Sequence, residues 1–230
     1  AIPAGAVTSI VGPNGCGKST LVKLAAGLLR PVAGRVEVAG HDTGELASRE
    51  RAHLMAVLAQ SSRVPPMTVE ALVACGRHPH LDRWGWESAK DAQIVRQALT
   101  AVDLAEFEQR DIQTLSGGER QRLAIATLLA QQPELFLLDE PVAYLDLKHQ
   151  IAMLELFAGA ARECGAAVAM VLHEPALAWR YCDRVLLVNG DGVTECGPAR
   201  EMLTAEKLSA LYDYPMLAFE RDGQLCLIPQ

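Results

Sequence analysis

Short apolar runs alternate along the chain with longer segments in which apolar residues recur every three or four positions. The runs occupy residues 6–11, 54–59, 135–138, 166–172 and 185–188, and turn residues or charged residues follow most of them. Continuous apolar runs of this length predict strands that are buried on both faces. Strands that alternate with helices predict an α/β fold with a mainly parallel sheet.

Helices are expected where the apolar spacing is helical. The expected ranges are 18–29, 68–75, 87–102, a helix that begins at Ser116, 147–163 and 175–181. A short strand is also expected at 35–39, and Asp222-Gly223 between two alternating runs predicts a hairpin over 217–227. The region 61–130 contains helical patterns only. We therefore expect residues 1–60 and 131–230 to form an α/β core, and residues 61–130 to form an inserted α-helical subdomain.

Composition narrows the class of protein. The chain has 230 residues, of which 50% are hydrophobic and 21% charged, as in a globular domain. Asp and Glu number 28 against 21 Lys and Arg, for a net charge of −7, so the chain has no overall positive field for nucleic acid. The apolar runs are too short to cross a bilayer. The 6 cysteines show no C-x-x-C spacing, so free thiols in a reducing compartment are expected.

A glycine-rich loop follows the first predicted strand and opens a predicted helix. It matches G-x-x-x-x-G-K-[ST] and consists of Gly12, Pro13, Asn14, Gly15, Cys16, Gly17, Lys18 and Ser19. Glycines let backbone N–H groups turn towards phosphate oxygens, and the helix N-terminus adds partial positive charge.

The residues at the end of this loop have separate expected roles. Lys18 would reach the β and γ phosphates of a nucleotide, Thr20 the α phosphate, and the Ser19 hydroxyl would be a ligand of Mg²⁺. A chance glycine loop is the alternative, and the position between a strand and a helix argues against it.

Two acids follow the apolar run 135–138. Asp139 would hold Mg²⁺, directly or through water, and Glu140 would polarise the attacking water. Taken alone, the pair could also be a strand end that meets solvent. The upstream phosphate loop favours the chemical interpretation.

The segment Leu115-Ser116-Gly117-Gly118-Glu119-Arg120-Gln121-Arg122 predicts a helix start. Ser116 is an N-cap, and Glu119 three residues later completes a capping box. Gly117 and Gly118 in the first turn cost about 1 kcal/mol each in helix stability. They are understandable if the backbone must approach an anion closely, and an ordinary capped helix is the alternative.

Together these motifs resemble those of the ATP-binding subunits of ABC transporters, over nearly the whole chain. LSGGERQR resembles their signature, GPNGCGKST their Walker A loop and LFLLDE their Walker B strand. In the same order, Gln60 resembles the Q-loop glutamine, Asp146 the D-loop aspartate and His173 the switch histidine. The resemblance implies a P-loop NTPase (RecA-like) core, with ATP and Mg²⁺ as cofactors.

The resemblance also implies a head-to-tail dimer of two copies of the chain. Each ATP would lie between the Walker A loop of one copy and the signature and D-loop of the other. The residues acting in trans would be Ser116, Gly117, Gly118, Glu119 and Asp146. Gln60 would contact Mg²⁺ and the attacking water, and His173 the γ phosphate. The alternative for His173 is a structural hydrogen bond at a strand end.

The segment Gly76-Arg77-His78-Pro79-His80 resembles the GRxPH segment of ATPases that serve ferric-siderophore, haem and cobalamin importers. This resemblance implies that the chain has permease subunits as partners and acts indirectly with a substrate-binding protein. It also implies a peripheral location on the cytoplasmic face of the cell membrane. An iron–siderophore is the first expected cargo, then haem or cobalamin. Trp84 and Trp86 would face the permease or cover the core of the helical insert. A soluble ABC ATPase without a permease is the competing class.

The chain departs from the resembled pattern at three places. The family has a longer segment before the phosphate loop, with an aromatic residue that stacks on adenine. The absence of this segment before Gly12 suggests a truncated N-terminus. The absence of the aromatic residue predicts that the free energy of ATP binding is weaker by about 1–3 kcal/mol, by analogy with other stacked bases. Val142 stands where Ser or Thr is common, and Glu174 where Asp is usual. Both leave the turnover rate open.

Overall fold

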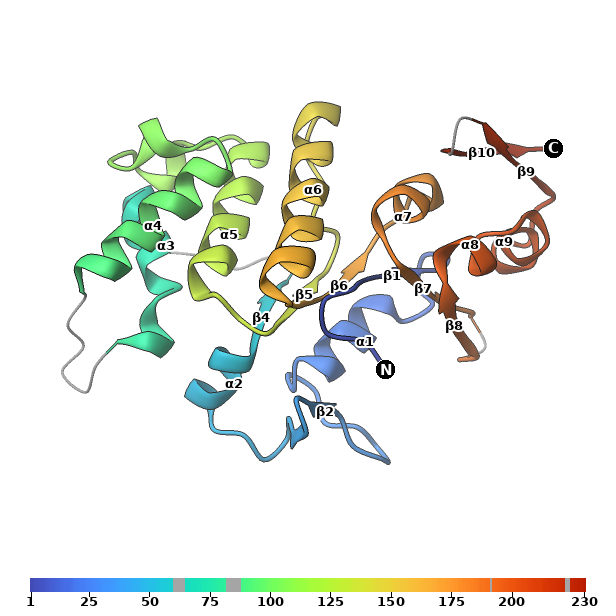
Figure 1. Ribbon diagram of the computed structural model, residues 1–230, viewed down its shortest axis with the longest axis horizontal. Helices are drawn as coiled ribbons and strands as arrows, with labels where there is room; N and C mark the ends of the chain where they lie inside the picture. The colour runs from blue at the N-terminus through green and yellow to red at the C-terminus, as the bar shows by residue number, and fades with distance from the viewer. Residues whose placement is uncertain (60–64, 82–87, 191, 222–223) are drawn as a thin grey trace.

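Six strands form the central sheet of the computed structural model, which describes residues 1–59, 65–81, 88–190, 192–221 and 224–230. In spatial order they are β4 (Met55–Leu58), β5 (Leu135–Leu138), β6 (Ala167–Val171), β1 (Val7–Val11), β7 (Arg184–Val188) and β8 (Thr194–Pro198). The first five are parallel, and β8 is antiparallel to β7 (Figure 1). The predicted α/β fold with a mainly parallel sheet is confirmed.

Strand β5 shows why the apolar runs are continuous. Leu135 and Leu137 belong to a core cluster that also contains Val22 of α1 (Lys18–Ala25). Phe136 and Leu138 point the other way, into the cluster that includes α6 (Leu147–Cys164). Helices therefore cover both faces of the sheet, and all four positions of β5 are apolar and buried.

Three helices form a separate group beside the sheet. They are α3 (Val69–Cys75), α4 (Ala89–Ala101) and α5 (Gly117–Gln131), and they pack on one another (Figure 1). The short 3₁₀ turns η1 (His78–His80), η2 (Ala105–Phe107) and η3 (Ile112–Thr114) connect them. The side chains of Thr68, Ser88 and Ser116 cap α3, α4 and α5, as the sequence predicts for the first and last of these.

The remaining elements flank the sheet. They are α2 (Ser48–Leu54), α7 (Pro175–Tyr181), α8 (Ala199–Met202), α9 (Ala205–Tyr212) and the hairpin β9 (Met216–Arg221) with β10 (Gln224–Pro229). The hairpin is confirmed, although its turn Asp222-Gly223 lies outside the described residues. All six cysteines are free. Among the described helices, none combines the length and apolar character that crossing a membrane requires.

Three expected elements have different bounds in the structure. Helix α1 ends at Ala25 rather than residue 29, because Gly27 takes a left-handed conformation (φ 66°) that terminates it. The strand expected at 35–39 is only β2 (Glu37–Val38), paired with β3 (His41–Asp42) across a tight turn at Ala39 and Gly40. Helix α4 begins at Ala89, after the cap at Ser88.

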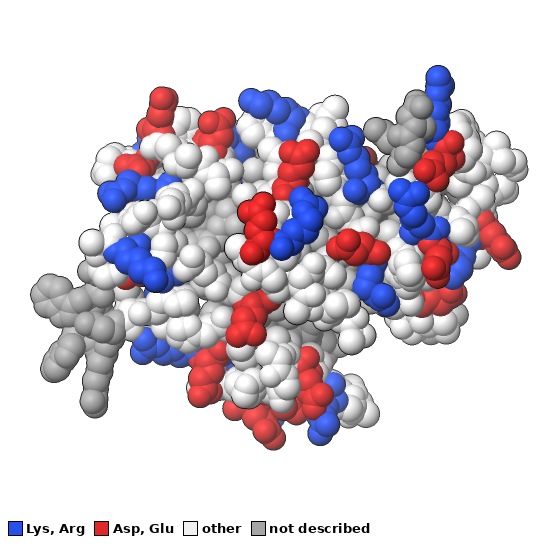
Figure 2. All heavy atoms as spheres, viewed as in Figure 1, with Lys and Arg blue, Asp and Glu red and all other residues white. Residues whose placement is uncertain are grey.

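The surface carries both signs of charge. Acidic and basic side chains are interspersed over the face shown in Figure 2. Exposed ion pairs such as Lys207 with Glu195 (2.8 Å) and Arg200 with Glu220 (3.3 Å) fit this mixture. Such exposed pairs contribute little to stability.

The GRxPH-like segment lies at a packed junction of the helices. The Arg77 side chain is buried; its Nε donates to Asp91 Oδ1 of α4 (2.8 Å) and its Nη1 to the Ala130 carbonyl of α5 (2.7 Å). A Cβ added at the preceding Gly76 would lie 2.3 Å from the Thr127 carbonyl of α5. This segment therefore holds α3, α4 and α5 together. Trp84 and Trp86 lie outside the described residues.

The close approach at Gly76 gives a first prediction. Gly76→Ala should lower the free energy of unfolding by about 1–3 kcal/mol, because the helices must separate to admit the methyl group. Gly159→Ala in α6 is the matched control, since nothing lies within 4 Å of its Cβ. That control should be neutral or stabilise by about 0.5–1 kcal/mol. Urea unfolding measures both, and equal effects would contradict the packing argument.

The Arg77–Asp91 pair gives a second prediction. The Ser88 hydroxyl and N–H, followed by Arg77, lower the pKa of Asp91 from 3.8 to about 2. Because the pKa of Asp91 is lower in the folded state than in the unfolded state, its ionised carboxylate stabilises the fold above pH 4. This contribution is lost as the pH falls towards 2. Asp91→Asn should lower the free energy of unfolding at pH 7 by roughly 2–4 kcal/mol. The gap between the two proteins should narrow below pH 4.

Asp103→Asn is the control for this pair. The Asp103 carboxylate also faces an arginine, Arg122, at 3.9 Å, but its side chain is 82% exposed. Its replacement should change the unfolding free energy by less than about 0.5 kcal/mol at any of these pH values. A gap for Asp91→Asn that stays constant from pH 7 to pH 3 would exclude the proposed role of the carboxylate charge.

Candidate nucleotide site

The predicted site segments meet at one edge of the sheet. Residues 12–17 follow β1, Asp139 and Glu140 follow β5, and His173 lies just beyond the end of β6. Strands β5, β6 and β1 are parallel neighbours, so the residues after their carboxyl ends lie together. Gln60 follows β4, the next strand in the sheet, and lies outside the described residues.

The loop between β1 and α1 depends on glycine at three positions. A Cβ at Gly12 would lie 2.4 Å from the Val188 carbonyl, and Gly15 and Gly17 have φ of 81° and 100°. Gly17 is the N-cap of α1, with no side-chain cap and no acidic residue in the first turn. The first amides of α1 are therefore not engaged by a side-chain cap, and the helix dipole favours an anion there.

Lys18 is held over this loop. Its side chain is buried, with the residue 6% exposed, and Nζ donates to the carbonyls of Gly12 and Pro13 at 2.8 Å each. An ammonium group has three donors, so these two bonds leave one for a ligand. The positive charge is thus held beside the loop between β1 and α1.

Asp139 passes a test for a hard metal ion. The residue is 5% exposed, and its Oδ1 is a buried carboxylate oxygen with no hydrogen-bond partner. A buried charged oxygen without a partner is costly, and Mg²⁺ would satisfy it, because hard cations prefer oxygen ligands. The Ser19 hydroxyl, in the first turn of α1, would be a second oxygen ligand for the ion. The donor set fits Mg²⁺.

Glu140 and His173 are in direct contact. His173 Nε2 lies 2.8 Å from Glu140 Oε1, and both side chains are partly exposed. Glu140 also has a left-handed backbone (φ 55°), a conformation that costs about 1–3 kcal/mol in a residue other than glycine. The sequence predicts separate roles for the two residues. The contact between them was not predicted, and it would allow the imidazole to orient the carboxylate.

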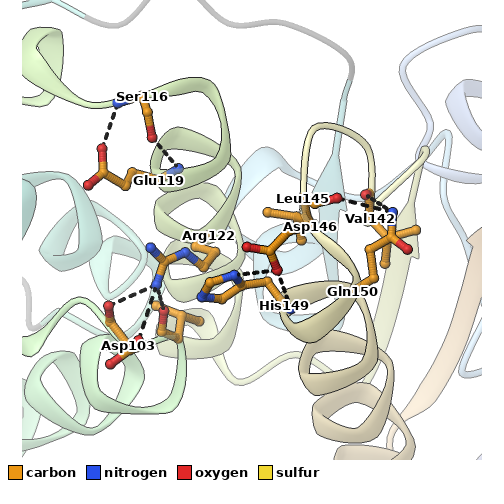
Figure 3. A network of polar contacts seen from close by, with 10 residues as sticks. Asp103, Ser116, Glu119, Arg122, Val142, Leu145, Asp146, His149 and Gln150 are labelled. Carbon is orange, nitrogen blue, oxygen red and sulfur yellow. Dashed lines mark hydrogen bonds and ion pairs between the residues drawn. The ribbon is translucent and has the colours of Figure 1, made fainter.

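The signature segment forms the predicted capping box at the start of α5 (Figure 3). Ser116 N–H donates to Glu119 Oε2 (2.6 Å), and Glu119 N–H donates to Ser116 Oγ (3.3 Å). Hydrogen bonds from the Ser116 N–H and hydroxyl to the carboxylate lower the pKa of Glu119. A Cβ at Gly118 would lie 3.2 Å from the Tyr144 carbonyl. The contact described for Gly118 is therefore with the D-loop of the same chain.

Asp146 has a structural role that sequence analysis missed. It is the N-cap of α6 and accepts from His149 N–H (2.9 Å), and its Oδ1 also lies 2.8 Å from His149 Nδ1 (Figure 3). These bonds lower the pKa of Asp146. Gln150 Nε2 donates to the Leu145 carbonyl (3.2 Å). An Asp directly before a helical pattern is the signal that predicts this cap.

Gln121 and Arg122, the last two residues of the signature-like stretch, also make contacts that the sequence analysis did not predict. Gln121 Nε2 donates to the carbonyls of Pro141 (2.9 Å) and Glu140 (3.3 Å), in the turn after β5. Arg122 Nη1 donates to the carbonyls of Val102 and Asp103 (2.8 Å each), at the end of α4 (Figure 3). The acceptors are backbone carbonyls, which do not depend on the residue type, so neither contact was predictable from the sequence.

Comparisons with known proteins agree with this geometry. Residues 1–143 match the family described as ABC transporter. Ferric enterobactin transport ATP-binding protein FepC of Escherichia coli is 40% identical over 92% of this chain and 78% of its own length. Cobalamin import ATP-binding protein BtuD of Halobacterium salinarum is 41% identical over 91% of this chain. The chain spans about half (52%) of that relative's length.

A haem relative and a solved structure extend the comparison. Hemin import ATP-binding protein HmuV of Nocardia farcinica is 42% identical over 94% of this chain and 74% of its own length. A solved structure described as a metal-chelate type ABC transporter in an inward-facing conformation has a TM-score of 0.82 and 30% identity, over 99% of this chain and 87% of that one. On these matches the chain belongs to the ABC transporter family, as an ATP-binding subunit of its metal-chelate importer branch.

Proposed function

We propose that the chain binds and hydrolyses ATP to energise the uptake of a metal chelate. The observation that carries this proposal is the meeting of the phosphate loop, the buried Asp139 oxygen and the Glu140–His173 pair at one edge of the sheet. In this proposal residues 1–60 and 131–230 form the nucleotide-binding core, and residues 61–130 form the helical subdomain.

Each residue at this edge has a chemical task in the proposed reaction. The backbone N–H groups of residues 14–20 and the Lys18 ammonium hold the phosphates. Asp139, Ser19 and Gln60 hold Mg²⁺, which when bound neutralises charge on the transferred phosphoryl group. Glu140 accepts a proton from the attacking water, and His173 fixes the carboxylate and contacts the γ phosphate.

The proposed site is completed by a second copy of the chain. Ser116, Gly117, Gly118 and Glu119 lie at the N-terminus of α5, which favours an anion, and Asp146 lies in the neighbouring D-loop. A head-to-tail dimer would place them against the nucleotide of the partner. A solved relative of 28% identity and TM-score 0.77, covering 87% of this chain and 88% of that one, is described as a dimeric ATP-binding cassette bound to ADP and Pi, which supports this arrangement.

The proposed complex includes permease subunits at the cytoplasmic face of the membrane and, indirectly, a substrate-binding protein. A ferric siderophore is the first proposed cargo, and relatives named for ferric enterobactin and iron(3+)-hydroxamate, 40% and 39% identical to the chain, support it. Haem and cobalamin are the alternatives, since relatives named for them are equally similar. A soluble ABC ATPase without a permease is the remaining class. Co-sedimentation with membranes separates it from an importer subunit.

The site geometry gives a third prediction. Lys18→Ala should abolish measurable ATP binding, because it removes the buried charge from the loop. Glu140→Gln should retain ATP binding within about twofold but lower kcat by at least about 100-fold, as loss of a general base does. Nucleotide-binding titrations and phosphate release measure the two effects. Normal turnover by Glu140→Gln would remove Glu140 from the role of base.

Transport gives a fourth prediction. A strain lacking the gene should lose uptake of one labelled chelate among ferric siderophores, haem and cobalamin. The wild-type gene should restore it, and the Lys18→Ala gene should not. Unchanged uptake of all three chelates would exclude the metal-chelate cargo while leaving the ATPase proposal in place.

A further inference from the structure

Glu140 is constrained through both its backbone and its side chain. Its φ of 55° is left-handed, and such a conformation persists only where surrounding contacts hold it. Gln121 of α5 supplies those contacts on one side, through hydrogen bonds from Nε2 to the carbonyls of Glu140 (3.3 Å) and Pro141 (2.9 Å). On the other side, His173 contacts the carboxylate itself at 2.8 Å.

The position of Gln121 on α5 links two functional segments. Ser116 caps the helix, and Gln121 lies five residues further on, about 7.5 Å along the helix axis. The start of α5 carries the signature, which in the proposed dimer serves the partner's nucleotide. One turn later, the same helix is bonded to the turn that carries the base for the chain's own nucleotide.

The rest of α5 is anchored in the same manner. The neighbouring Arg122 bonds to the carbonyls of Val102 and Asp103 in the helical group. At the other end, Gln131 Nε2 bonds to the carbonyls of Ala52 and Met55 (2.6 and 2.8 Å), next to β4. Gln121 is therefore carried by a helix that is fixed to both the helical group and the sheet, and a displacement of the signature would reach Glu140 through it.

We propose that Gln121 is a positioning residue for Glu140, tying the placement of the base to the engagement of the signature at the start of the same helix. The inference rests on the proposed function, because it assigns Glu140 as the base and the signature to the partner's nucleotide. Gln121 touches no nucleotide in this proposal. Its amide acts only through the backbone of Glu140 and Pro141.

The test is the effect of Gln121→Leu on turnover in the full chain. Leucine removes the donor and keeps an apolar side chain of similar size. We expect kcat to fall about 10- to 100-fold, with KM and the Kd for ATP within about twofold. Gln121→Glu keeps the side-chain length but also lacks the donor at neutral pH, so it should show the same split and serves as the second variant.

Gln131→Leu is the matched control on the same helix. It removes an amide that also bonds to two backbone carbonyls, but at the end of α5 remote from the signature. Its kcat should stay within about twofold of wild type, even where its Tm falls as far as that of Gln121→Leu. Equal losses of kcat in the two variants would show that the effect is general destabilisation and would overturn the proposal.

A second readout separates positioning of the base from damage to the signature. In the Glu140→Gln background, ATP-dependent dimerisation followed by size-exclusion chromatography should be the same with and without Gln121→Leu. Loss of the dimer, or an unchanged kcat for Gln121→Leu in the wild-type background, would overturn the inference. A wild-type chain that neither dimerises with ATP nor hydrolyses it would instead overturn the proposed function, and the inference with it.

Discussion

The burial of β5 on both faces is the constraint on which the rest of the structure depends. Its four residues are each less than 8% exposed, packed between α1 on one side and α6 on the other. The polar chemistry of β5 therefore lies after its last residue, at Asp139 and Glu140. Strands β1 and β6 are largely buried as well, with Thr8 and Ser9 as the polar residues inside β1. The edge where these strands end is the place where polar groups from distant parts of the sequence can meet.

Helix α5 connects this edge to the helical group. Its N-terminus carries the signature, Gln121 reaches the turn after β5, and Arg122 reaches the end of α4. Neighbouring residues on a helix point in different directions, about 100° apart, so adjacent side chains can bond to two different bodies. The helix therefore contacts both the candidate site and the helical group, through the last two residues of the signature-like stretch.

Much of this arrangement was predictable from the sequence, for reasons that differ by residue. The glycines of the phosphate loop and the capping box at Ser116 depend on local backbone geometry, and local geometry is encoded in nearby residues. The contact of His173 with Glu140 joins residues that follow two neighbouring strands, and only the sheet order reveals it. Gln121 and Gln150 donate to backbone carbonyls. Every residue has such a carbonyl, so the residue type at the acceptor position does not predict the contact. The early end of α1 follows from a single glycine, Gly27, which the apolar spacing could not register.

The order of strands in the sheet has a consequence for how the chain folds. Strand β1 pairs with β6 and β7, so Val7 can pair with Val168 only when about 160 further residues of the chain are present. Pairings of such long sequence separation are slow to form. The contacts among α3, α4 and α5 join residues that are much closer together in the sequence, so they can form before the strands of the sheet have all paired. A chain emerging from the ribosome is therefore expected to hold an ordered helical group next to an unpaired β1 until β6 has been made.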